Sequence, residues 1–176
     1  MSNTKASAKR EAQRQARKAV FELLYETEYH PESTPEEIFA LAVENRDIDP
    51  ENKYISRVYF GIMSHMDELD ELIGKHAKGW RTNRLSRISR AVLRLGAYEM
   101  AYDGTPAPVV INEAVELSKT FDDEKARAFI NGVLNAIKNA LAEAKNQPAT
   151  AETAQTAETA ETADVSAESD EEGAEA

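Results

Sequence analysis

The stretch that decides the fold is residues 85–102, which read LSRISRAVLRLGAYEMAY. Its apolar residues recur every three or four positions, at Ile88, Val92, Leu95, Tyr98 and Tyr102. This period places them on one side of an α-helix, whereas a strand would divide them between its two faces. Residues 103–108, DGTPAP, end the helix, because Gly permits the closing turn and Pro cannot continue a helix.

The same period extends toward the N-terminus. Residues 8–29 predict a helix, since one face carries Ala16, Val20, Phe21, Leu24 and Tyr25. Residues 34–37, TPEE, form a capping box with Pro at the first helical position, and predict a second helix that runs to Val43. An apolar stripe from Ile55 to Ile73 then predicts a long helix that begins near Asp49-Pro50 and ends near Gly74 or Gly79.

Two further helices are predicted after residue 108. Residues 109–121 have helical spacing, although VVI at 109–111 alone is also typical of a strand, and Asn112 and Glu113 are expected to cap the helix start. Asp122 or Asp123 can cap a last helix, in which Gly132 suggests close packing against a neighbour. No alternating run is long enough for a sheet, so the fold class is all-α, a compact helical bundle.

The net charge hides an uneven distribution. The chain holds 21 Lys and Arg against 32 Asp and Glu, a formal net charge of −11. Nine of the acidic residues lie in residues 147–176, a Thr/Ala/Glu-rich segment without Lys, Arg or aromatic residues. Such a segment cannot bury enough apolar surface to offset its ordering entropy. We therefore expect a domain of residues 1–146, close to neutral, followed by a disordered acidic tail.

Basic residues gather in two stripes with helical spacing. The first holds Arg10, Arg14 and Arg17, with Lys18 beside them. The second holds Arg84, Arg87, Arg90 and Arg94. Like charges at these spacings destabilise a helix unless an anion answers them, and phosphate fits the planar donor fork of Arg. With Tyr25 and Phe129, which are either stacking or core residues, the stripes favour single-stranded RNA over the alternative of a solvated charged face.

Other chemistry has little support in the sequence. The absence of cysteine excludes disulfides, thiolate metal sites and cysteine nucleophiles. His30, His65 and His76 are too far apart to indicate a metal site, and the glycines form no phosphate loop. We therefore expect no catalytic residues, no metal and no cofactor. No apolar run is long enough to span a membrane and no signal-type segment follows the basic start, so we expect a cytoplasmic protein.

Four blocks of the sequence resemble the NusB family. Residues 14–25, RQARKAVFELLY, resemble its arginine-rich opening helix, and residues 80–100 resemble its central helix. Residues 108–121, PVVINEAVELSKTF, are similar to the family's V-A-I-N-E-A-V-E-L-A-K-x-F, and FINGVL at 129–134 matches F-V-N-G-V-L. The blocks follow the family's order and spacing over about residues 8–141, which makes the resemblance specific.

The resemblance implies a non-enzymatic, all-helical protein of two small subdomains that acts in transcription antitermination and ribosomal RNA synthesis. Family members bind boxA RNA together with NusE, a small-subunit ribosomal protein, and join elongating RNA polymerase with other Nus factors. The resemblance and the stripes place RNA contacts at Arg10, Arg14, Arg17, Lys18, Tyr25, Arg84, Arg87, Lys125, Arg127 and Phe129. NusE contacts are expected on the central helix, at Arg90, Arg94, Tyr98, Glu99 and Tyr102.

Two other functions are alternatives to an RNA-binding antitermination factor. The first is a protein–protein adaptor with little RNA affinity of its own. Gln13 and Gln15 stand where other members have a denser arginine cluster, which is expected to lower the affinity for RNA alone and to leave more of the binding to the partner. The second is an RNA-modifying enzyme, since a NusB-like domain is fused to some ribosomal RNA methyltransferases, but this chain has no room for their cofactor-binding domain. A monomer and a homodimer are both compatible with the sequence.

The acidic tail lies outside the family pattern and suggests a test. Nine tethered carboxylates have a high effective concentration, and we hypothesise that they compete with RNA for the basic faces. Deleting residues 147–176 is then expected to tighten RNA binding at low salt, which a filter-binding titration at two salt concentrations measures. Unchanged affinity would mean that the tail only improves solubility.

Overall fold

The computed structural model describes residues 2–46, 48–77, 85–121 and 123–146. The expected tail lies outside these ranges, as do Gly79 and Arg84. The described residues form helices and no strands, which confirms the all-α class. VVI at 109–111 is helical, and its helix begins at Ala107. The prediction that Asn112 and Glu113 cap the start of this helix is therefore wrong, because both lie inside it. None of these helices is long and apolar enough to cross a membrane.

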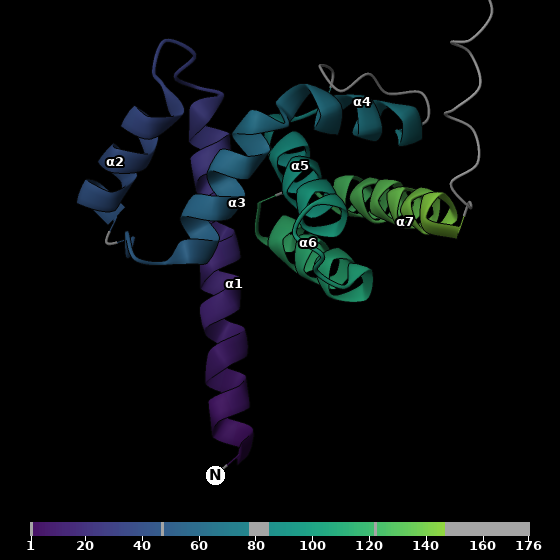
Figure 1. The fold of residues 1–176 in the computed structure, drawn as a ribbon, viewed down its shortest axis with the longest axis horizontal. Helices are drawn as coiled ribbons and strands as arrows, with labels where there is room; N and C mark the ends of the chain where they lie inside the picture. The colour runs from purple at the N-terminus through teal and green to yellow at the C-terminus, as the bar shows by residue number, and fades with distance from the viewer. Residues whose placement is uncertain (1, 47, 78–84, 122, 147–176) are drawn as a thin grey trace, which may run out of the picture. The chain divides into compact units, whose positions relative to one another are not determined.

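The helices fall into two groups that share one interface (Figure 1). The first group holds α1 (Ser2–Thr27), α2 (Pro35–Arg46) and α3 (Lys53–Ser64). The second holds α4 (Met66–His76), α5 (Arg87–Ala101), α6 (Ala107–Phe121) and α7 (Glu124–Asn146). Because α1 and α3 both pack against α5, residues 1–146 form one compact unit. The N-terminal half of α1 extends past the other helices (Figure 1).

Side chains next to the helix starts account for several boundaries. The capping box is confirmed: the Thr34 N–H donates to Glu37 Oε2 at 2.9 Å, and the Glu37 N–H donates to Thr34 Oγ1 at 3.2 Å. Asp123 caps α7, since its Oδ1 accepts the Ala126 N–H at 2.8 Å. The predicted start at Asp49-Pro50 is wrong, because Asn52 caps α3 by accepting the N–H groups of the first turn.

The long helix predicted across the apolar stripe from Ile55 to Ile73 is divided at His65. Its N–H donates to the carbonyls of both Gly61 and Ile62, which tightens the last turn of α3. The His65 ring adds a bond between Nδ1 and the Gly61 oxygen at 2.8 Å. The apolar residues of α4 continue the helical spacing of those in α3. The hydrophobic pattern is therefore the same as that of one long helix and does not indicate the break.

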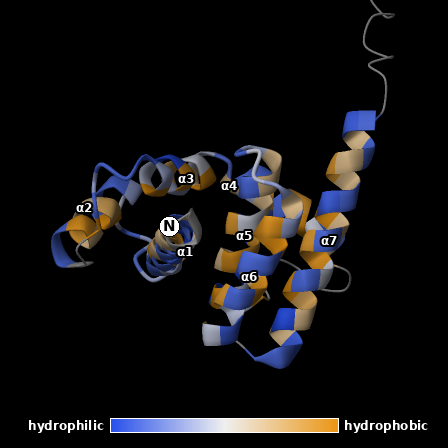
Figure 2. Cartoon of the chain, turned by 90° about the horizontal axis from the view of Figure 1, so that it is seen from below, coloured by the Kyte–Doolittle hydropathy of each residue, from blue (hydrophilic) through white to orange (hydrophobic). Residues whose placement is uncertain are grey.

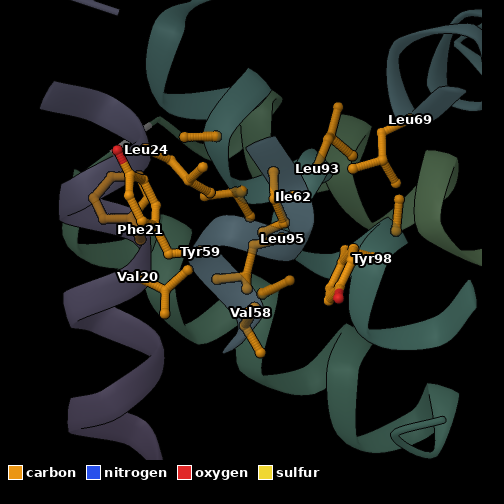
Figure 3. Packing of buried hydrophobic residues seen from close by; sticks show 14 of the residues in the cluster. Val20, Phe21, Leu24, Val58, Tyr59, Ile62, Leu69, Leu93, Leu95 and Tyr98 are labelled. Carbon is orange, nitrogen blue, oxygen red and sulfur yellow. The ribbon is translucent and has the colours of Figure 1, made fainter. Parts of the chain in front are cut away.

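The core lies between α1, α3 and α5. In Figure 3 the labelled side chains of α1, Val20, Phe21 and Leu24, point toward those of α3 and α5. Figure 2 shows the apolar faces of α5 and α7 lying toward each other in the second group. Burying one Leu, Ile or Val of this kind contributes roughly 1.5–3 kcal/mol, so the α1 and α3 faces are firmly joined to α5.

The expectation that Gly132 marks close helix packing is wrong. A Cβ built at Gly132 meets nothing within 4 Å, whereas a Cβ at Gly96 would lie 3.0 Å from Leu134. The closest approach is at Gly61 in α3, where a Cβ would overlap the hydroxyl and ring of the buried Tyr98.

These glycines give a matched pair of substitutions. Gly61→Ala is expected to lower the free energy of unfolding by about 1–3 kcal/mol, because the Tyr98 ring must move within a packed core. Gly132→Ala is expected to raise the same free energy by up to about 1 kcal/mol, through helix propensity alone. Urea unfolding of both variants measures this, and equal effects at the two sites would contradict the packing described here.

Candidate nucleic-acid and partner interface

The protruding half of α1 presents an exposed basic surface. Lys5, Lys9 and Arg10 are exposed, and within the described ranges no carboxylate pairs with any of them. Arg14 follows on the same helix and is also exposed, but its Nε donates to both carboxylate oxygens of Glu113 at 3.1 Å. This bond raises the pKa of the Arg14 guanidinium. The start of α1 therefore presents cations to solvent.

Arg17, expected to contact RNA, is instead buried. Its Nε donates to the two oxygens of Glu99 in α5, at 2.9 and 3.1 Å. The Tyr54 hydroxyl of α3 donates to Glu99 Oε1 at 2.8 Å, and the Arg17 guanidinium lies over the Tyr54 ring. Burial raises the pKa of Glu99, opposed by the attraction of Arg17. The placements of Arg17 on the RNA surface and of Glu99 on the NusE surface are corrected, because the two form an interior ion pair.

Arginines of the second stripe also form ion pairs with carboxylates of the protein itself. Arg90 and Arg94 donate to Glu28 at the end of α1, and Arg94 donates to Asp70 of α4 at 2.7 Å as well. All four side chains are largely shielded from solvent. The prediction that Arg90 and Arg94 meet NusE is therefore corrected: both are engaged in tying α1, α4 and α5 together. The anions that neutralise Arg90 and Arg94 are carboxylates of the protein and not phosphates of RNA.

Arg87 keeps part of its surface open. Its side chain is 47% exposed and its Nε lies 4.0 Å from Glu28, at the edge of the network. The guanidinium sits over the ring of Tyr29, 4.2 Å from the ring centroid. Arg84, the remaining member of the second stripe, lies outside the described residues.

The two tyrosines near the C-terminal end of α5 differ in their exposure to solvent. Tyr98 is 8% exposed and lies beneath Gly61, so its placement on the NusE surface is corrected. Tyr102 is 45% exposed. Its ring packs on His65 with 4.3 Å between centroids, and its hydroxyl donates to Glu68. Of the five residues expected to meet NusE, Tyr102 is the one with substantial exposed surface.

Aromatic rings form a continuous ladder along the second half of α1. The ring of Phe21 lies 4.8 Å from that of Phe121 in α6 and 6.1 Å from that of Tyr25. Tyr25 in turn contacts Tyr29, with centroids 5.0 Å apart and the two hydroxyl oxygens 3.0 Å apart. The hydrogen bond to Tyr25 lowers the pKa of Tyr29, and Arg87 lowers it further.

A hollow of about 570 Å³ opens beside this ladder. Its lining residues are Phe21, Glu22, Tyr25, Glu26, Tyr29, His30, Ile88 and Phe121. The sequence pointed to Tyr25 but not to Tyr29, Glu22 or Glu26. For Tyr29 the only signal in the sequence is its spacing of four from Tyr25, which places both tyrosines on the same face of a helix.

The other residues expected at the RNA site occupy two places. Lys18 is 46% exposed and pairs with Glu22 at 3.5 Å, next to the hollow. Lys125 is exposed and Arg127 half-buried in the first turn of α7, while Phe129 is half-buried and packs against the core. The described ranges hold no cluster of His, Asp and Glu suited to a metal ion.

Fold and surface define an all-helical domain with a protruding basic helix beside an aromatic hollow. The NusB family model matches residues 14–139, and the chain belongs to the NusB family. The transcription antitermination protein NusB of Bacillus subtilis is 42% identical over 104 residues, 58% of this chain and 77% of the relative. That of Myxococcus xanthus is 44% identical over 108 residues, 60% of this chain and 77% of the relative.

A solved structure with the same fold contains nucleic acid. It is a crystal structure of antitermination factors NusB and NusE in complex with double-stranded RNA, 33% identical with a TM-score of 0.66. The match covers 73% of this chain and 96% of the solved chain.

Proposed function

We propose that this protein is a non-catalytic transcription antitermination factor that binds single-stranded, boxA-type RNA together with NusE. In this role the heterodimer joins elongating RNA polymerase with other Nus factors and promotes ribosomal RNA transcription. The observation that carries the proposal is the protruding start of α1, whose exposed cations lie on the helix that also lines the aromatic hollow. The antitermination proteins to which the chain is similar, and the solved NusB–NusE–RNA complex, support the assignment.

The proposed RNA site differs from the set expected from the sequence. Phosphates meet Lys9, Arg10 and Arg14, and Arg14 exchanges its exposed contact with Glu113 for RNA. Exposed ion pairs of this kind contribute little to stability because solvent screens them, so the exchange costs little. Lys18, Arg87 and Tyr25 continue the path toward the hollow. The family resemblance supports placing the other end of this RNA path at Lys125, Arg127 and Phe129.

NusE is proposed to dock on the second helical group, beside Tyr102. An exposed aromatic ring fixed by His65 and Glu68 is the kind of anchor that protein interfaces use. Arg90, Arg94 and Glu99 act from beneath this surface, by holding α5 against α1 and α4.

Fluorescence anisotropy of a labelled boxA-type RNA, at several salt concentrations and with and without NusE, tests the proposal. We expect affinity to rise when NusE is present and to fall steeply with salt, since phosphate contacts release counterions. A stable complex with NusE but no RNA binding in either condition would instead identify the protein as an adaptor. The exposed ring of Tyr102 gives that second function its support, since such a ring can anchor a protein partner without RNA.

A further inference from the structure

The hollow beside α1 combines two features that phosphate binding does not explain. Its wall is aromatic, built from Phe21, Tyr25, Tyr29 and Phe121. Its rim carries two carboxylates, Glu22 and Glu26, which stand one helical turn apart on α1. Carboxylates repel the phosphate backbone, so this part of the surface is suited to a different portion of an RNA strand.

The aromatic wall offers a stacking platform. The rings of Phe121, Phe21, Tyr25 and Tyr29 follow one another at centroid distances of 4.8, 6.1 and 5.0 Å. Arg87 closes one end of the row, 4.2 Å above the Tyr29 ring. An unpaired base that stacks on such a row gains affinity whichever base it is, because every base has an aromatic face.

Cations lie on both sides of the hollow. Lys18, 46% exposed, pairs with Glu22 at one side, and Arg87, 47% exposed, stands over Tyr29 at the other. A strand whose phosphates meet these two side chains places a base between them, over the hollow. An apolar protein side chain would bury the rim carboxylates against hydrocarbon, which is costly, so the rim favours a polar aromatic group.

We propose that this hollow binds one unpaired guanine of the RNA, stacked on the tyrosine row and read by the carboxylates of Glu22 and Glu26. Guanine presents two adjacent donors, N1–H and the N2 amino group, which match the two oxygens of one carboxylate. Adenine and cytosine present a donor beside a ring acceptor, and uracil a donor between two acceptors, so each of them sets a lone pair against a carboxylate oxygen. The inference rests on the proposed RNA binding and adds the identity of one base.

Oligouridine strands with a single central nucleotide test the inference on the full chain. The central nucleotide is guanosine, inosine, adenosine or uridine, and affinity is measured by anisotropy at fixed salt. Inosine keeps N1–H but lacks the N2 amino group, so it isolates one hydrogen bond to a carboxylate. We expect guanosine to bind about 10-fold more tightly than inosine, the effect of about 1.4 kcal/mol.

Two variants assign the effect to the rim. Glu22→Gln/Glu26→Gln is expected to bring the guanosine-to-inosine ratio close to one, and Glu44→Gln, an exposed position on α2, is expected to leave it unchanged. The ratio cancels the general gain in RNA affinity that comes from removing negative charge. Circular dichroism and urea unfolding establish that the variants fold.

The outcomes separate the two proposals. If these oligonucleotides and the boxA-type RNA all fail to bind, with or without NusE, the RNA-binding function is overturned and this inference with it. Binding with equal affinity for guanosine and inosine would overturn the guanine pocket alone. If the guanosine-to-inosine affinity ratio is unchanged in the double variant, the carboxylates of Glu22 and Glu26 do not recognise the base.

Discussion

Replacing Glu99 by Ala is expected to lower the free energy of unfolding by about 3–5 kcal/mol. Glu99 is 1% exposed and accepts hydrogen bonds from Arg17 of α1 and Tyr54 of α3. Its removal leaves the Arg17 guanidinium buried without its counterion, and leaves the Tyr54 hydroxyl without its acceptor. Since these three residues come from three helices, the loss loosens the contact between the two helical groups.

Urea unfolding followed by circular dichroism measures this effect, and the chain offers a matched control. Glu113 holds Arg14 with similar distances, but Arg14 is 51% exposed, so Glu113→Ala is expected to cost far less than Glu99→Ala. The double variant Glu99→Leu/Arg17→Met is expected to recover much of the stability, because it removes both charges. Equal losses from Glu99→Ala and Glu113→Ala would contradict the burial assigned to the Arg17 pair.

Reversing the two free charges near the start of α1, in Lys9→Glu/Arg10→Glu, is expected to weaken RNA binding by about 100-fold or more. Two charge-assisted contacts are lost, at roughly 1.5 kcal/mol each, and repulsion adds to that loss. Both residues are exposed on the protruding half of α1, so the free energy of unfolding is expected to stay nearly unchanged. Anisotropy with boxA-type RNA gives the affinity, and urea unfolding gives the stability.

The control for this variant must change the net charge equally at a distance from the proposed site. Lys75→Glu/Lys145→Glu meets this condition, since both lysines are exposed, one in the last turn of α4 and the other in the last turn of α7. We expect it to weaken RNA binding only slightly. If the two double variants weaken binding alike, the effect comes from net charge, and the start of α1 is not the RNA surface.

The sequence predicts best those features whose cause lies within a few residues. The Thr34–Glu37 capping box and the Asp123 cap are correct because donor and acceptor are neighbours in the chain. The helical spacing of residues 85–102 likewise identifies α5. The break at His65 escapes prediction, since two short helices in phase carry the same apolar pattern as one long helix.

The candidate site is less predictable because its key contacts join distant residues. Arg17 and Glu99 are separated by 82 positions, and Arg94 lies 66 positions from Glu28. A stripe of arginines on a helix indicates that an anion is needed, but only the packing of the helices decides whether a carboxylate or an RNA phosphate supplies it. For Lys9 and Arg10 no carboxylate does so within the described ranges.

The salt dependence of RNA affinity provides the most direct test that the start of α1 binds phosphates. The logarithm of the association constant for a boxA-type single strand, with NusE at saturation, is plotted against the logarithm of salt concentration for the parent chain and for Lys9→Ala/Arg10→Ala. Each phosphate contact on a single strand contributes about 0.7 to the slope, so we predict a slope shallower by about 1.4 in the variant. Identical slopes for the two proteins would contradict the assignment of RNA binding to this helix.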